Sequence, residues 1–155
     1  ECVGNILGWT HADLQADPAD FLNAISIIKQ SKDSNQVFIK GKRLGRPFTD
    51  VFFTWGMTIF ERLILGVQLN DINAQPTVFS RDFFTSLQQP PIDFSIDLYF
   101  YYEAVKHNYN IKRFPVKFGL RLEGQGHNEK LISKLKYSWK TIIFSLGLRR
   151  HIKVN

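Results

Sequence analysis

The amino-acid sequence predicts an α/β domain in which a mixed sheet is flanked by helices and the chain ends in a basic amphipathic helix. Short apolar runs of strand length alternate with longer segments whose apolar residues recur at helical spacing. Hydrophobic residues make up 44% and aromatic residues 14% of the 155 residues, which suits a single packed domain over residues 1–155. The net charge of +6 favours anionic ligands.

Strands are expected over residues 6–10, 37–39, 77–79 and 111–118. The last segment contains Pro115, which lacks the N–H group that an interior strand needs, so an edge or irregular strand is expected there. Helices are expected over residues 18–31, 49–65, 82–87, 95–107 and 128–148. Asp17 and Pro18 favour the start of the first helix, and Gly66 favours the end of the second.

The apolar residues of two expected helices predict their surroundings. In the segment 49–65 these residues recur at helical spacing and are assigned to the core, namely Val51, Phe52, Trp55, Ile59, Phe60 and Leu63. Positions 99–102 hold four consecutive aromatic residues, which cannot share one face of a helix. Some of these four side chains must therefore meet a second packing partner or an interface.

A candidate metal site follows the first expected strand. In an extended segment the side chains of His11, Asp13 and Gln15 point to one side, which brings an imidazole, a carboxylate and an amide oxygen together. One carboxylate with weaker ligands suits Mg²⁺ or Mn²⁺, which completes its coordination with water and phosphate oxygens. The alternative, which spacing alone favours, is a polar turn in which Asp13 caps a local backbone group.

Two basic segments are candidates for contact with anions. Residues 40–47 are expected to form a glycine-containing loop in which Arg43 and Arg46 hold phosphate, with a solvated turn as the alternative. Residues 128–155 are expected to form the amphipathic helix and basic tail, which can lie in a membrane interface. The alternative for this helix is packing on its own domain with its basic residues at the rim.

Several segments occur in the order found in one known family. The run from His11 to Pro18 resembles the metal-binding segment of family 2 glycosyltransferases, in particular the polyprenyl (dolichyl) phosphate branch. Lys40-Gly41-Lys42-Arg43 is similar to the family's Gly-x-Arg loop. Asp71-Ile72-Asn73-Ala74-Gln75-Pro76 with Phe79-Ser80-Arg81 resembles its Asp-(x)-Gly-Phe-Arg segment, and Arg121-Leu122-Glu123-Gly124 resembles its Arg-x-x-Gly motif. Together these landmarks are far more specific than any one of them.

The resemblance implies a GT-A fold, which is Rossmann-like, and a divalent cation, Mg²⁺ or Mn²⁺. Asp13 and Gln15 would ligate the metal, and His11 stands where the family has its first aspartate. A sugar would pass with inversion from a nucleotide-diphosphate sugar to a polyprenyl phosphate or a glycan acceptor. The family's upstream half, which holds the nucleotide base, is largely absent, so further strands are expected ahead of this chain.

The resemblance also implies roles for residues further along the chain. The residues expected to contact substrate or its phosphates are Arg43, Arg46, Gln75, Arg81 and Arg121. Asp97, or less readily Asp71, would be the general base that a hydroxyl acceptor needs, whereas a phosphate acceptor needs none. The implied location is cytoplasmic, with peripheral attachment to the inner face of the membrane. The single cysteine, Cys2, fits a reducing compartment.

Two functions of other classes are compatible with the sequence. One is a non-catalytic, transferase-like module that binds a membrane or a protein partner through its basic helix. The other is nucleic-acid binding, which the net charge of +6 allows. Nucleic acid is disfavoured as a partner because the aromatic residues sit at apolar helical spacing and are not interleaved with the basic residues.

Overall fold

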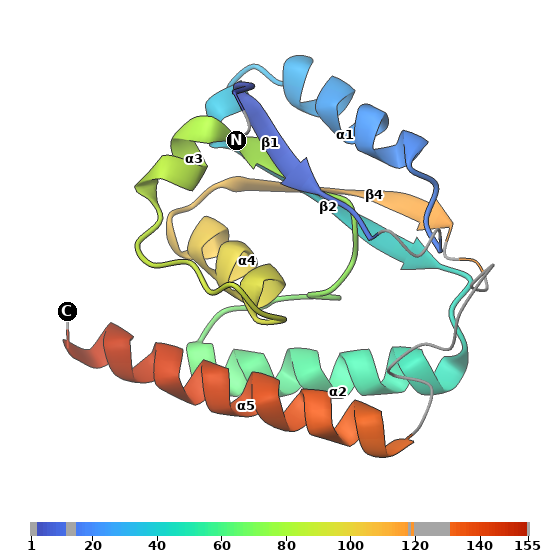
Figure 1. Ribbon diagram of the computed structural model, residues 1–155, viewed down its shortest axis with the longest axis vertical. Helices are drawn as coiled ribbons and strands as arrows, with labels where there is room; N and C mark the ends of the chain where they lie inside the picture. Colours follow the sequence, from blue (N-terminus) through green and yellow to red (C-terminus); the bar gives the residue numbers. More distant parts are fainter. Residues whose placement is uncertain (1–2, 12–14, 118, 120–130, 155) are drawn as a thin grey trace.

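One mixed sheet with helices on both faces organises the part of the chain that the computed structural model describes, which is residues 3–11, 15–117, 119 and 131–154 (Figure 1). Its strands are β1 (Ile6–Trp9), β2 (Val37–Leu44), β3 (Thr77–Ser80) and β4 (Asn110–Lys117), in the order β1-β3-β2-β4. Strand β3 is antiparallel to β1 and β2, whereas β2 and β4 are parallel. The predicted α/β class with a mixed, helix-flanked sheet is confirmed.

The helices form unequal layers on the two faces of the sheet. Helix α1 (Ala19–Lys29) covers one face, where Ala24 and Ile28 pack against Val37, Ile39 and Val78. On the other face lies α4 (Ile96–Lys106), and beyond it α2 (Phe48–Leu65) and α5 (Leu131–Val154) lie side by side (Figure 1). The short α3 (Arg81–Ser86) follows β3 directly, and a 3-10 turn at Ser34–Gln36 precedes β2.

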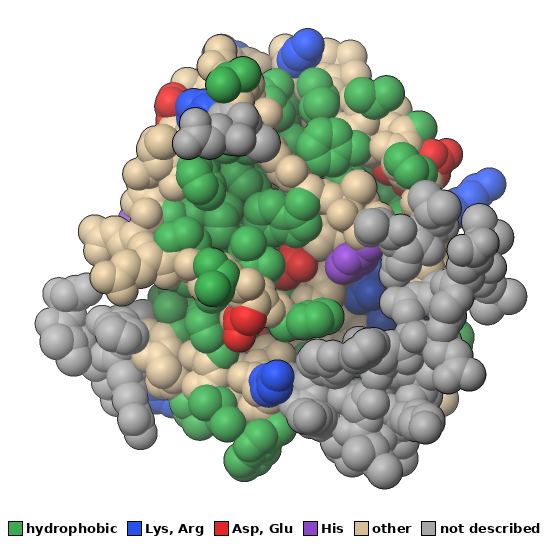
Figure 2. Space-filling model, viewed as in Figure 1, with side chains coloured by type: hydrophobic (Ala, Val, Ile, Leu, Met, Phe, Trp, Pro, Cys, Tyr) green, Lys and Arg blue, Asp and Glu red, His purple; other side chains and the backbone are tan. Residues whose placement is uncertain are grey.

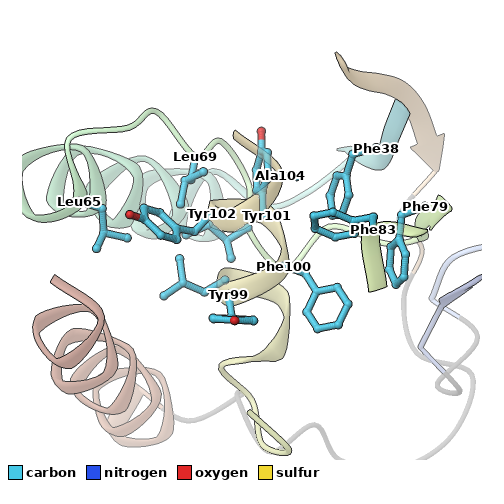
Figure 3. Packing of buried hydrophobic residues seen from close by; sticks show 12 residues of the cluster. Phe38, Leu65, Leu69, Phe79, Phe83, Tyr99, Phe100, Tyr101, Tyr102 and Ala104 are labelled. Atoms are coloured by element: carbon cyan, nitrogen blue, oxygen red, sulfur yellow. The ribbon is translucent and has the colours of Figure 1, made fainter. Parts of the chain in front are cut away.

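Helix α4 is buried on almost every side. Its consecutive aromatic residues Tyr99, Phe100, Tyr101 and Tyr102 all belong to one core cluster. This cluster joins Phe38 and Phe79 of the sheet to Leu65 of α2, and Figure 3 shows α4 between these two groups. The prediction that the four aromatic residues need a second partner is confirmed, because the α2–α5 pair covers the side of α4 that the sheet leaves open.

The segment 40–47 differs from its prediction as a loop. Strand β2 continues to Leu44, because Lys40 to Leu44 pair in register with Arg113 to Lys117 of β4. The partner strand lies about 70 residues further along the chain, and no local pattern in residues 40–44 reveals it. Strand β4 is an edge strand, as its proline predicts.

The core assignment of α2 is also wrong. Most of the apolar residues assigned to packing are exposed, namely Val51, Phe52, Trp55, Ile59 and Leu63. Helical periodicity shows that apolar residues share a face, but the tertiary structure decides whether that face is covered. None of the helices in the described part of the chain is both long and apolar enough to cross a membrane.

Candidate functional site

A row of polar side chains crosses the sheet on the face that α4 covers. Trp9 of β1 is paired with Thr77 of β3, Thr77 with Lys40 of β2, and Lys40 with Arg113 of β4. Residues that are partners in register point to the same face of a sheet. The four side chains therefore lie in one line across all four strands, and we call them the polar row.

The carboxylate of Asp97 lies over this polar row. Asp97 is in the first turn of α4, where the positive end of the helix dipole favours a carboxylate. Its Oδ1 atom accepts hydrogen bonds from Lys40 Nζ at 3.2 Å, Trp9 Nε1 at 3.3 Å and Thr77 Oγ1 at 3.3 Å. Lys40 Nζ also donates to Thr77 Oγ1 at 2.9 Å. Side chains of the sheet thus hold one oxygen of the Asp97 carboxylate in place.

Gln75 holds the same carboxylate from the loop that precedes β3. Its Nε2 atom lies 2.9 Å from both Oδ1 and Oδ2 of Asp97, and this pairing sets the orientation of the amide. The loop reaches this position because residue 41 is a glycine. A Cβ atom on Gly41 would lie 2.0 Å from the carbonyl oxygen of Gln75, and the Gly41 N–H donates to the Pro76 carbonyl at 3.0 Å.

Lys40 is the most deeply buried charged group of the site. It has no exposed surface, and its ammonium lies 5.5 Å from the centre of the Tyr101 ring. Burial lowers the pKa of Lys40, while the charge and hydrogen bond of Asp97 oppose that change and Arg113 adds to it. The Asp97 carboxylate is therefore the group that makes a charged lysine tolerable at this depth.

A second cluster adjoins the polar row and is centred on Asp71. Its Oδ1 accepts from Arg43 Nε at 2.9 Å and from Arg46 Nη1 at 3.2 Å, and Arg43 Nη2 also contacts it. Arg113 joins the two groups, because its Nη2 lies 3.7 Å from Asp71 Oδ2 and donates to the Gly41 carbonyl at 2.8 Å. Asp71 itself has a φ of 50°, in the left-handed region.

The Asp71 cluster carries an excess of positive charge. Burial raises the pKa of Asp71, but the hydrogen bonds and charges of Arg43 and Arg46 outweigh it, so the net pKa is lowered. Burial and the neighbouring Arg43 lower the pKa of Arg46. Three guanidinium groups surround the Asp71 carboxylate, and Asp50 is a further carboxylate whose charge acts on Arg46, so one positive charge remains that an anion would offset.

The structure brings together only some of the residues that the sequence nominated. Asp97 and Gln75 are in direct contact, and Arg43, Arg46 and Asp71 form the adjoining cluster. Arg81 lies at the other end of β3, about 13 Å of strand away from Thr77, where its Nε donates to the Gly4 carbonyl at 2.8 Å.

The proposed metal ligands lie at the border of the described chain. His11 is exposed and follows Trp9 by two residues, and Gln15 Nε2 donates to the Gly119 carbonyl at 3.3 Å. Asp13 and Arg121 fall outside the described residues. Across the ranges that are described, no three side chains of His, Cys, Asp or Glu gather into a group able to hold a metal ion.

Sequence reasoning missed four residues of the site: Trp9, Lys40, Thr77 and Arg113. Lys40 follows three apolar residues and precedes a glycine, which indicates a strand end and not a buried ion pair. The alternation of side chains along a strand is the one pattern that indicates burial of Lys40, because residues two positions apart share a face and Lys40 therefore lies on the same face of β2 as the core residue Phe38. The chain matches no model of a known protein family and no curated protein.

Proposed function

We propose that this chain is a metal-dependent, inverting glycosyltransferase with a GT-A-like fold that transfers a sugar from a nucleotide-diphosphate sugar. The observation that supports this most directly is the position of Asp97, whose carboxylate is held by four donors beside a cluster of three arginines. A cationic site suits the leaving diphosphate, and the carboxylate beside it suits the general base that a hydroxyl acceptor needs.

In this proposal Arg43 and Arg46 neutralise the diphosphate that leaves the donor sugar, together with Arg121. Asp71 positions the guanidinium groups, and its lowered pKa makes it a poor general base. Asp97 acts through Oδ2, which accepts only the Gln75 bond among the contacts of the described residues. The acceptor oxygen attacks the sugar carbon as the bond to the diphosphate breaks, and Asp97 takes the proton of a hydroxyl acceptor.

The divalent cation would be held by Asp13 with His11 and Gln15. An imidazole, a carboxylate and an amide oxygen suit Mg²⁺ or Mn²⁺, and a bound cation would supply charge stabilisation to the leaving diphosphate. Strand β1 links this segment to the polar row, because Trp9 donates to Asp97 only two residues before His11. In this scheme Gln75 positions the Asp97 carboxylate through its hydrogen bond, and Arg81, which contacts Gly4 at the other end of β3, does not contact the substrate.

The proposed acceptor is a polyprenyl phosphate or a lipid-linked glycan, and the proposed place of action is the cytoplasmic, inner face of a membrane. A phosphate acceptor is itself anionic, so the positive excess of the Asp71 cluster suits acceptor and donor alike. A hydroxyl acceptor would depend on Asp97 as base, so the effect of Asp97→Asn on transfer distinguishes the two acceptor classes.

The thermal stability of the chain with UDP, GDP or dTDP, each with and without Mn²⁺, tests this proposal. Ligand at about 100 times Kd stabilises a protein by about 2.7 kcal/mol, which is a visible change in Tm. We expect one nucleotide to raise the Tm only when Mn²⁺ is present, and Asp13→Ala to abolish the effect. Asp97→Asn should keep the rise in Tm and lower kcat for a hydroxyl acceptor by about 10² or more.

The same experiment separates the transferase from its main alternative. A non-catalytic module that binds a membrane or a protein partner would show no rise in Tm with any combination of nucleotide and metal. That outcome would overturn the proposed activity. A rise in Tm that persists in Asp13→Ala would overturn the assignment of the metal ligands.

A further inference from the structure

Helices α2 and α5 carry apolar residues on their outer side as well as on their inner side. On α2 the exposed row consists of Phe48, Val51, Phe52, Trp55, Ile59 and Leu63, and on α5 it consists of Trp139, Ile143 and Leu146. We call these two rows the outer apolar face. Phe48 is 83%, Leu63 74%, Trp139 63% and Trp55 60% exposed, which is unusual for so many large side chains in one place.

Both rows point away from the rest of the domain. Ile64 and Leu65 of α2 and Phe144 and Leu148 of α5 contact the same core cluster. At about 100° per residue, the exposed row of each helix lies on the side opposite these core residues. Figure 2 shows hydrophobic side chains at the lower edge of the molecule, where α5 runs in Figure 1.

Positive charge borders this outer apolar face. The sequence of α5 contains no Asp or Glu, and its basic residues are Lys134, Lys136, Lys140, Arg149, Arg150 and Lys153. Lys140 and Arg149 are exposed, and helical geometry places each about 60° beyond one edge of the row that contains Trp139. The one acidic residue of α2 near its end, Glu61, is buried on the inner side.

We propose that the outer apolar face of α2 and α5 docks on the surface of an anionic lipid bilayer. Aromatic and aliphatic side chains flanked by lysine and arginine are the pattern of a helix that lies in a membrane interface. The inference deepens the proposed function, because a lipid-linked acceptor would reach the site from this surface.

The charge of α5 argues against a second copy of this chain as the occupant. In a two-fold interface the same surface meets itself, so the basic residues of both α5 helices would be brought into one interface. Like charges placed opposite each other disfavour such an interface, whereas anionic lipid headgroups attract both borders. The bilayer is therefore the occupant that satisfies the apolar rows and the charges together.

Co-sedimentation with vesicles tests the proposal. Vesicles of equal phosphatidylglycerol and phosphatidylcholine should bind the protein at least about tenfold more tightly than phosphatidylcholine alone. Phe52→Ser with Trp55→Ser should weaken binding at least about tenfold, and so should Lys140→Glu with Arg149→Glu. The matched control is Leu22→Ser with Ile92→Ser, which removes two side chains that are 65% and 103% exposed elsewhere and should leave binding unchanged.

Three outcomes would overturn the docking proposal: no binding to anionic vesicles, equal loss in the control variant, or a dimer that the Phe52 and Trp55 changes convert to monomer. Sedimentation equilibrium detects the last. The proposed activity fails separately, because vesicle binding needs no catalysis and Asp97→Asn should bind vesicles like the unaltered protein. If nucleotide and Mn²⁺ raise the Tm but the protein does not bind vesicles, the proposed transferase activity is retained and only the proposed docking on a bilayer is rejected.

Discussion

The Nζ atom of Lys40 lies 3.2 Å from Oδ1 of Asp97, and the lysine side chain has no exposed surface. A strand near the centre of the sheet and the first turn of α4, 57 positions apart in sequence, meet at this ion pair. Removal of one member of a buried ion pair leaves the other charge without its partner. The pair therefore couples the fold to the candidate site.

We expect Lys40→Met to lower the free energy of unfolding by about 3 kcal/mol, because Asp97 would lose the one cationic group that the described residues place at hydrogen-bond distance. Urea denaturation measures this change. Lys42→Met, on the same strand at an exposed position, should change stability by less than about 0.5 kcal/mol. Asp97→Asn combined with Lys40→Met should be more stable than Lys40→Met alone; if it is not, the ion pair does not cause the loss.

The close approach of Gly41 to the Gln75 loop predicts a packing effect. Gly41→Ala places a Cβ atom 2.0 Å from the Gln75 carbonyl oxygen, so the loop must move and Gln75 must leave Asp97. We expect a loss of about 2–3 kcal/mol of stability, measured by denaturation. Gly56→Ala, in the middle of α2 with no atom within 4 Å of the added Cβ, should instead stabilise by about 0.5–1 kcal/mol. Equal effects of the two substitutions would contradict this account.

The contact between α2 and α5 predicts a pH effect. Glu61 is buried, Ser145 Oγ donates to its Oε1 at 2.8 Å, and its Oε2 has no hydrogen-bond partner among the described residues. Burial raises the pKa of Glu61 from 4.5 to about 7, although the Ser145 hydrogen bond opposes this change. The folded state therefore favours the protonated carboxyl.

The sign of the effect follows from this raised pKa. The stabilisation from protonated Glu61 is complete below pH 4.5 and is lost as the pH rises through 7. Between pH 5 and pH 8 the unaltered protein should lose about 2–3 kcal/mol of unfolding free energy that Glu61→Gln retains. Denaturation at the two pH values measures it. Asp33→Asn, at an exposed carboxylate, should show the same pH dependence as the unaltered protein; a parallel curve for Glu61→Gln would refute the assignment.

Local patterns determined much of the architecture of this chain. The positions of β1, β3, α1, α3 and α4 follow from apolar runs, helical spacing and the residues that start and end helices. Pro115 predicted an edge or irregular strand, and β4 is an edge strand; the aromatic run at 99–102 predicted a second packing partner or an interface, and α4 is buried between the sheet and the α2–α5 pair. The sequence also predicts five site residues that the structure places in two adjoining clusters: Asp97, Gln75, Arg43, Arg46 and Asp71.

What the sequence by itself determined is the set of elements and the faces on which their apolar residues gather, because both depend on residues a few positions apart. The tertiary structure alone decided which faces are covered and which charges meet. The outer row of α2 is exposed because the α4 core contacts the other side of that helix. Lys40 is an interior ion-pair partner because β3 and β4 bracket β2 and α4 brings Asp97 over it. The exposure of the α2 row and the burial of Lys40 both depend on contacts between segments far apart in the sequence, and a short stretch of sequence does not reveal those contacts.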